Sequence, residues 1–282
     1  MKEFVELNQP EELNNETEII EWLKQNPWLD NFINSKSPSV ELNRALENNE
    51  LIEYPELTKL TETPEDPTYH GEKNTWAHTL LVLDEVEKIT NREKLSTKDT
   101  IIIKLGALCH DLGKPLVTKI ENGKVTAYQH EEAGESLAFS LLNKINTPKT
   151  ITESIIPLVK EHLFPILNPN PSNQAIKKLL TRLGKTTVDQ LLLITEADQK
   201  GRLNSGFDQT ALDSFKKSVK KYFIESQRVV IKPLLSGQDL INLGYKAGSE
   251  IGVLLKKINN AQKEGLIKNK REAINYINLT KD

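Results

Sequence analysis

The sequence predicts a mainly α-helical protein with one small β-hairpin. Across most of the 282 residues, apolar side chains recur every three or four positions, which is the period of an amphipathic helix. Glycine and proline separate these segments, and only one short stretch alternates in the way a strand does. Hydrophobic residues make up 37% of the chain, which is enough to build a substantial core.

Helix signals can be placed in order along the chain. Residues 75–89 carry the first strong one, and Asn74 before them is a suitable N-cap because its side-chain oxygen can accept a hydrogen bond from a free backbone N–H. A second helix, capped by Thr97 or Asp99, is expected to end near His110. Further helices are predicted at residues 150–162, 173–183, 187–198, 209–227, 238–243, 249–263 and 270–278.

The β-hairpin is predicted within residues 117–128. Asn122-Gly123 lies there between two short alternating runs, and this dipeptide suits the positive backbone angles of a two-residue turn. Elsewhere, Pro157 interrupts the helix predicted at residues 150–162. It should therefore displace the start of that helix or kink it.

Two breaks divide the chain into three parts. A loop rich in proline and glycine begins near residue 63, and a second break falls near Pro233. We therefore expect an acidic helical N-terminal segment, a central domain and a basic C-terminal helical segment, at residues 1–62, 63–231 and 232–282. In the first of these, Trp22 and Trp28 are expected to dock a small helical subdomain rather than to form a ligand-binding cage.

Charge is unevenly distributed although the net charge is only −3. Residues 1–70 contain 5 Lys and Arg against 16 Asp and Glu, whereas residues 211–282 contain 14 against 7. The basic end could lie along a phosphate backbone, or it could be a solvated helix face. The sequence leaves both interpretations open.

Several classes of protein are excluded or disfavoured. Cys109 is the only cysteine, so an intrachain disulfide and a multi-cysteine zinc module are excluded, and we expect Cys109 to be a small buried apolar residue. Apolar runs are far shorter than the roughly 20 residues of a membrane span. The acidic N-terminus lacks the features of a secretion signal. We therefore expect a soluble, cytoplasmic protein without a membrane partner.

Histidines and aspartates suggest a metal site. All five histidines lie between residues 70 and 162, and His110 is followed directly by Asp111 at the end of an apolar helix. A buried histidine is commonly structural, but an unpaired buried carboxylate is costly and needs a cation nearby. A divalent metal supplies that cation, and imidazole with carboxylate is a normal ligand set for Mg²⁺, Mn²⁺, Fe²⁺, Ni²⁺ or Zn²⁺.

Two more residues fit such a site. Asp198 ends an apolar stretch, where the alternative is a capping or solvent-facing aspartate. His78 lies one turn inside its predicted helix, on or beside the apolar stripe that should face the core. Together these residues predict a metal site inside a helical core.

The chain resembles a known family. The order His78, His110-Asp111, Asp198 is similar to the His…His-Asp…Asp ligand pattern of the HD-domain metal-dependent phosphohydrolase superfamily. The resemblance is most specific to the HD region of bacterial tRNA nucleotidyltransferases, the CCA-adding enzymes. It is carried there by YHGEKNTWAHT (69–79), LCHDLGKP (108–115), HEEAG (130–134), EHLFPIL (161–167), LLTRLG (179–184) and EADQKGR (196–202). Residues 234–267 resemble the C-terminal helical segment of the same family.

The resemblance implies an HD-domain helical bundle for residues 63–231, with one or two divalent metal ions per chain. The implied metal ligands are His78, His110, Asp111 and Asp198. His130 and His162 follow in the order that dinuclear members of the superfamily have. They either bind a second metal or contact phosphate beside a single one, and the sequence leaves both open.

The resemblance to the HD-domain family also implies roles for the remaining residues of the site. The catalytic residues are expected to be Asp111, Lys114, His130 and His162. Lys114, Arg182 and Arg202 are expected to bind substrate, with surface or ion-pair roles as the alternative. Glu72 could orient a ligand histidine, and His70 is expected at the rim of the pocket.

The resemblance implies a phosphohydrolase acting on nucleotides or RNA ends, including tRNA, that carry a 2′,3′-cyclic phosphate or a terminal phosphomonoester. Nothing in residues 1–50 resembles the nucleotidyltransferase head of the family, so we do not expect CCA addition by this chain alone. The alternatives are a non-catalytic tRNA- or RNA-binding module, and a hydrolase of a signalling or dinucleoside polyphosphate. A homo-oligomer is also compatible with the sequence.

Overall fold

The computed structural model describes residues 16–204, 206–226, 233–246, 248–263 and 266–279. The chain divides into two compact units, residues 1–222 and 223–282, and each is described by itself. The predicted boundary between residues 231 and 232 lies outside the described residues. The three-part division of the chain therefore stays a prediction.

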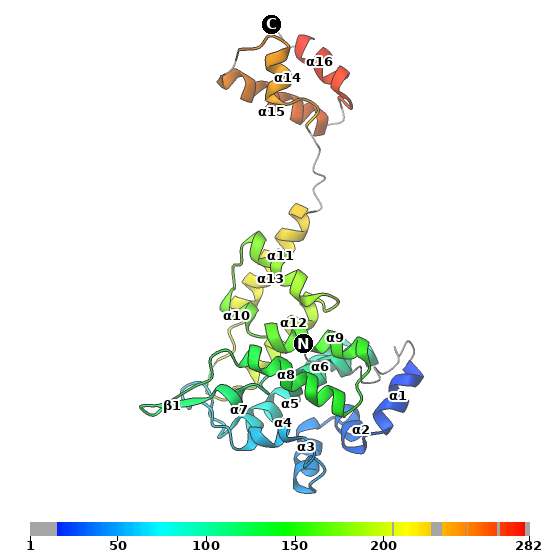
Figure 1. The fold of residues 1–282 in the computed structure, drawn as a ribbon, viewed down its shortest axis with the longest axis vertical. Coiled ribbons are helices and arrows are strands. Elements are labelled where there is room, and N and C mark those ends of the chain that lie inside the picture. Colours follow the sequence, from blue (N-terminus) through cyan, green and yellow to red (C-terminus); the bar gives the residue numbers. More distant parts are fainter. Residues whose placement is uncertain (1–15, 205, 227–232, 247, 264–265, 280–282) are drawn as a thin grey trace, which may run out of the picture. The chain divides into compact units, whose positions relative to one another are not determined.

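The prediction of a mainly α-helical fold with one small hairpin, flanked by helical segments, is confirmed (Figure 1). The elements of the first unit are α1 (Glu16–Lys24), α2 (Pro27–Asn34), α3 (Pro38–Glu47), α4 (Pro55–Thr58), a 3-10 turn (Lys59–Thr61), α5 (Thr75–Glu93), α6 (Thr97–Cys109), α7 (Lys114–Val117), β1 (Lys119–Glu121), β2 (Lys124–Thr126), α8 (His130–Lys144), α9 (Lys149–Glu161), α10 (Phe164–Leu167), α11 (Asn173–Leu183), α12 (Val188–Lys200) and α13 (Gln209–Ser226). Within the described residues, no helix combines the length and apolar character needed to span a bilayer.

The centre of the first unit is a group of packed helices. α5 packs against α6 and α12, and α9 packs against α6 and α8. From Ile101 to Cys109, α6 is buried on all sides, and Lys104 is the one charged residue in this part, which explains why its sequence shows no polar face there. Cys109 is buried at the end of this helix, as predicted.

The N-terminal helices share this core. Trp22 and Trp28 are both buried, and the Trp22 indole Nε1 donates a hydrogen bond to the Ile145 carbonyl oxygen at 2.8 Å. Lys104 of α6 is buried, and its ammonium donates to the Ile33 and Ser35 carbonyls at the end of α2, at 2.7 and 3.1 Å. The aromatic residues therefore dock the N-terminal helices, as the sequence predicts.

Local signals placed most of the long helices well, with exceptions at α6, α8 and α9, whereas the short helices α4, α7 and α10 were not predicted. Asn74 caps α5, because its side chain accepts from the Ala77 N–H at 2.9 Å. The expected cap of α6 was wrong: Ser96, not Thr97 or Asp99, accepts from the backbone at 3.1 Å. α8, at residues 130–144, was not predicted.

The hairpin forms where it was expected, with Asn122 and Gly123 at positive φ of 52° and 76°. Pro157 lies inside α9, whose first residue is Lys149, so the first alternative, a displaced helix start, was wrong, while the second, a kink, stays a prediction. A proline in this position has no N–H to donate to the preceding turn, and the packing of α9 against α6 and α8 outweighs that loss.

The second unit has its own small core. α14 (Gly237–Asn242), α15 (Ser249–Lys263) and α16 (Lys270–Leu279) pack together, with α15 in contact with both of the others. The buried residues of this core, which lie in the three helices and in the segments beside them, are Leu235, Leu240, Ile258, Ala261, Ile267, Ala273 and Ile277.

Gly113 is where the chain after α6 passes closest to α8. A Cβ atom at Gly113 would collide with the His130 carbonyl oxygen and lie 2.5 Å from the Gly134 nitrogen. Both neighbours are backbone atoms of α8, so they cannot rotate away as a side chain could. A side chain at residue 113 would push α8 away from the turn that carries Asp111.

We predict that Gly113→Ala destabilises the protein by about 1–3 kcal/mol, the usual cost of overpacking a close contact. Urea unfolding followed by circular dichroism measures the change. Gly206→Ala is the matched control, because nothing lies within 4 Å of a Cβ atom built there. Equal midpoints for the two variants would contradict the assignment of a close backbone contact.

Candidate metal centre

Five helices bring the predicted ligands together. His78 lies in α5 and Asp198 in α12, while His110 and Asp111 directly follow α6. The other two histidines are at helix ends: the first residue of α8 is His130, and His162 follows α9. All six side chains are buried.

Hydrogen bonds orient four histidines in the same way. The Nδ1 atoms of His110, His130 and His162 lie 2.6, 2.8 and 2.8 Å from the carbonyl oxygen three residues earlier in each case. Nδ1 of His78 lies 2.8 Å from a carboxylate oxygen of Glu72. Because an Nδ1–H donates in these bonds, Nε2 is left as the electron-pair donor. The four Nε2 atoms are thereby directed to the shared centre.

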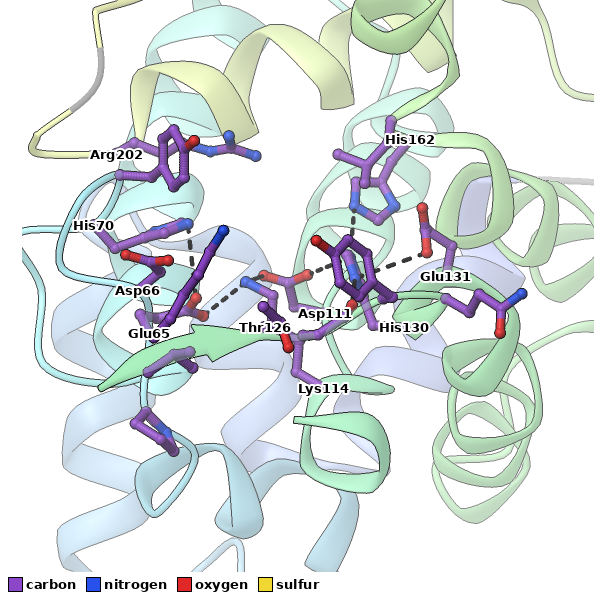
Figure 2. A pocket seen from close by; sticks show the side chains of 18 of the residues that line it. Glu65, Asp66, His70, Asp111, Lys114, Thr126, His130, Glu131, His162 and Arg202 are labelled. Atoms are coloured by element: carbon purple, nitrogen blue, oxygen red, sulfur yellow. Dashed lines mark hydrogen bonds and ion pairs between the residues drawn. The ribbon is translucent and has the colours of Figure 1, made fainter. Parts of the chain in front are cut away.

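The converging atoms form two adjacent groups. The first group is made of His78, His110 and Asp198, and the second of Asp111, His130 and His162. Within each group, one side-chain nitrogen or oxygen atom of every residue lies within 4.8 Å of those of the other two. Asp111 joins the groups, because its Oδ2 lies 3.1 Å from Nε2 of His110 and its Oδ1 lies 3.1 Å from Nε2 of His130. Figure 2 shows Asp111 beside His130.

Two atoms at this junction test whether a cation fits. Among the described residues, Nε2 of His110 is a buried side-chain atom without a hydrogen-bond partner, and Oδ2 of Asp111 has no hydrogen bond besides its ion pair with the Lys114 ammonium at 2.9 Å. Buried polar atoms are normally paired, and a cluster of imidazole nitrogens and carboxylate oxygens is a donor set that divalent metals bind. The residues present therefore fit a divalent metal ion.

Burial and mutual charge shift the pKa values of these groups strongly. Burial raises the pKa of Asp111, but the nearby His110 and Lys114 outweigh it and hold the pKa well below its usual range. Burial lowers the pKa of His78, but hydrogen bonds with Asp198 and Glu72 raise it to about 9. Burial and the adjacent His110 and His130 lower the pKa of His162 to about 3. Negative and positive groups are thus held at close range in a buried cluster.

Glu72 supports the histidine on α5. One carboxylate oxygen contacts Nδ1 of both His78 and His70, at 2.8 and 2.6 Å, and the other accepts from the Leu203 N–H at 3.3 Å. Burial raises the pKa of Glu72, but the hydrogen bonds from the two histidines lower it to about 2. This is the geometry expected for a carboxylate that fixes a ligand histidine.

A pocket of about 480 Å³ opens onto the cluster. Asp111, His130 and His162 line it together with Lys114 and Arg202 (Figure 2). His70 also lines the pocket, where the sequence predicted a rim residue.

Two of the cations that line the pocket, Lys114 and Arg202, form ion pairs with carboxylates. The Lys114 ammonium lies 2.9 Å from Asp111 and 2.7 Å from Glu65. Arg202 donates to Asp198 at 2.8 Å. The structure does not bring Arg182 to the pocket: its guanidinium forms a two-bond ion pair with Glu161, at 2.5 and 2.7 Å.

Glu65 is a site residue that sequence reasoning missed. It is buried in the loop before α5, accepts from the Thr75 hydroxyl at 2.7 Å and lies 3.6 Å from His70. Its only signal in the sequence is its place in the irregular segment before the first ligand helix. No spacing rule links that segment to Lys114, which is 49 residues further along the chain.

A profile of the HD domain family matches residues 75–198. This range contains four predicted ligands, from His78 on α5 to Asp198 on α12.

Residues 75–198 are thus similar to HD domains.

The resemblance to this family expected from the sequence is thereby confirmed. The HD domain is a fold of the metal-dependent phosphohydrolase type, and the clusters described above could hold a divalent metal.

Curated relatives extend the similarity beyond the HD domain. The chain is 28% identical over 184 residues to a "Multifunctional CCA protein" of Mannheimia succiniciproducens, which covers 64% of this chain and 42% of the relative. A protein of the same name from Pasteurella multocida is 31% identical over 160 residues, covering 55% and 36%. A "CC-adding tRNA nucleotidyltransferase" of Thermus thermophilus is 27% identical over 225 residues, covering 78% and 47%. The chain thus matches less than half the length of each relative.

We predict that Asp111→Ala loses metal while the protein stays folded, because Asp111 contacts histidines of both groups. Metal content after Mn²⁺ loading and gel filtration, together with circular dichroism, checks this. Asp189→Ala, at an exposed position of α12, serves as the control and should keep its metal. Full metal content in Asp111→Ala would remove the assignment.

We predict that Glu72→Gln weakens Mn²⁺ binding by about 10–100-fold, since carboxylates that orient metal-binding histidines commonly contribute that much. Calorimetric titration with Mn²⁺ measures the change. Glu47→Gln, at an exposed position of α3, should bind Mn²⁺ as the wild type does. Unchanged affinity in Glu72→Gln would show that Glu72 does not orient His78.

Proposed function

We propose that this protein is a metal-dependent phosphohydrolase that cleaves phosphoesters of nucleotides or RNA ends, namely 2′,3′-cyclic phosphodiesters and terminal phosphomonoesters. The observation that carries the proposal is the convergence of four histidine Nε2 atoms and two aspartates in one buried cluster, of which Asp111, His130 and His162 line an open pocket. A site with these ligands on the HD-domain scaffold is suited to phosphoryl chemistry.

The metal ligands are His78, His110, Asp111 and Asp198, with His130 and His162 completing a second position. A divalent ion supplies, when bound, positive charge that lowers the pKa of water and polarises a phosphoryl oxygen. The two-position arrangement is favoured over a single metal because each carboxylate oxygen of Asp111 faces a histidine of a different group. Metal analysis should accordingly give two ions per chain.

Lys114 and Arg202 are the cations placed to bind the phosphate. Both line the pocket. Burial lowers the pKa of Lys114, but the carboxylates of Asp111 and Glu65 outweigh burial and raise the pKa, so the ammonium stays charged. Each is held by a carboxylate of the cluster, which fixes the cation beside the reacting group. The substrate-binding role predicted for Arg182 stays a prediction, since its guanidinium pairs with Glu161 outside the pocket lining.

The names of the relatives support an RNA end as the substrate class. The Thermus relative is named for tRNA, and two further relatives are named as CCA proteins. An RNA end is therefore the preferred polymeric substrate, with residues 63–231 as the catalytic domain and the basic residues 232–282 as the segment that would contact the phosphate backbone.

The test is hydrolysis of 2′,3′-cyclic AMP by protein loaded with Mn²⁺ or Ni²⁺. We predict turnover by the wild type and by Asp189→Ala, and at least 100-fold slower turnover by Asp111→Ala, because loss of the metal removes the main source of charge stabilisation. Product analysis by chromatography measures the rates. Two outcomes would contradict the proposal. One is that Asp111→Ala turns over 2′,3′-cyclic AMP as fast as the wild type does. The other is that the wild type hydrolyses neither 2′,3′-cyclic AMP nor phosphomonoesters nor RNA ends.

A non-catalytic RNA-binding module is the second candidate, favoured by the names of the relatives and by the 14 Lys and Arg against 7 Asp and Glu in residues 211–282. Such a module should bind tRNA with an affinity that falls steeply as salt rises, because counterions are released from the phosphates. Binding of tRNA measured from 50 to 200 mM KCl separates the candidates. Steep salt dependence without turnover of any phosphoester would favour the binding module.

A further inference from the structure

Two exposed tyrosines line the mouth of the pocket. Tyr69 is 53% exposed and Tyr128 is 77% exposed, and both border the pocket that opens onto the histidine cluster. Among the described residues, the other large exposed aromatic side chains are Phe139 and Phe223, and neither borders this pocket. Half of the exposed aromatic side chains therefore gather at one opening.

Tyr69 is carried by a tight turn next to the site. The N–H groups of Tyr69 and His70 both donate to the Asp66 carbonyl, at 3.1 and 2.9 Å, and the Asp66 side chain accepts from the Thr68 N–H at 2.9 Å. His70 is in edge-to-face contact with His78 of the cluster, with ring centroids 4.7 Å apart. The backbone of Tyr69 is thereby fixed relative to the metal ligands, while its ring is left exposed.

Tyr128 is fixed in a similar way on the opposite segment. It lies between Ala127, whose carbonyl accepts from Nδ1 of His130 at 2.8 Å, and Gln129, which has a positive φ of 62°. A left-handed conformation is unfavourable for a glutamine, and such strain is commonly held at functional sites. The turn places His130 in the cluster and leaves the neighbouring tyrosine ring at the mouth.

The pocket is therefore charged at its floor and aromatic at its mouth. Asp111, Lys114 and Arg202 supply the charge, and the two tyrosines supply flat π surfaces from two separate segments. A ligand that matches both ends carries a phosphate and a planar ring. A phosphate ester without a ring would use the floor alone.

We propose that Tyr69 and Tyr128 bind the nucleobase of the substrate by stacking, so that the site selects nucleotides and RNA ends over phosphate esters without a base. The inference rests on the proposed phosphohydrolase function and specifies its substrate. Stacking of a base on an aromatic ring is favourable for every base, so the two tyrosines select for the presence of a base and tolerate its identity.

The test compares 2′,3′-cyclic AMP with methyl riboside 2′,3′-cyclic phosphate, which has the same reacting group and no base. We predict that Tyr69→Ala and Tyr128→Ala each raise the KM for cyclic AMP about tenfold, with little change in kcat, and leave the base-free substrate unaffected. The variants Tyr69→Phe and Tyr128→Phe should retain the wild-type KM, because they keep the ring. Phe139→Ala, at an exposed aromatic position away from the pocket, is the control for general effects.

Equal changes for both substrates, or no change for either, would overturn the stacking role while leaving the phosphohydrolase in place. Binding of a non-hydrolysable phosphonate analogue of 3′-AMP to the Mn²⁺-loaded protein, measured by calorimetry, gives a readout that does not need turnover. If the analogue binds through the tyrosines but none of the phosphate ester substrates is hydrolysed, the stacking role is supported and the hydrolase is rejected. The absence of both binding and turnover would reject both.

Discussion

The buried carboxylate of Asp111 is the group on which the site depends. It lies between His110 and His130 and 2.9 Å from the Lys114 ammonium, and it is almost fully buried at the inner end of the pocket. A carboxylate in such a place is stable only with positive charge and donors around it. The surrounding structure supplies these: two histidines from the ends of α6 and α8, a lysine one turn away, and a donor set for a divalent metal.

The six side chains of the cluster meet only because five helices are positioned relative to one another and three of them begin or end at a histidine of the cluster or directly before one. His110 and His162 each follow the last residue of a helix, and His130 is the first residue of one, so small shifts of α6, α8 or α9 would separate the ligands. Contact between backbones at Gly113 and α8 fixes one of these distances. Bonds from histidine Nδ1 to carbonyl oxygens three residues earlier then set the direction of each ring. The geometry of the site is thus a property of the helix ends, and those ends are held by the core.

Much of the fold could be predicted because its signals are local. Asn74 before α5 and Asn122-Gly123 in the hairpin act through their own backbone neighbours, and both behave as expected. The α8 helix was missed because Gly134 and a polar first turn weaken its local signal, and its packing against α9 makes up for that. Arg182 fits a family motif in the sequence, which predicts a role in binding phosphate. In the structure its guanidinium pairs instead with Glu161, which is 21 positions away and which no local pattern links to it.

By itself, the sequence determined the helical class, the hairpin, the burial of Cys109 and the order of histidines and aspartates from His78 to Asp198. These follow from composition, periodicity and motifs, which are properties of neighbouring residues. Only the tertiary structure decided that the predicted ligands form two groups joined by Asp111, that Glu65 holds Lys114, and that two tyrosines border the same opening. Those contacts join residues tens of positions apart, and their geometry is set by how the helices pack, which no local pattern encodes.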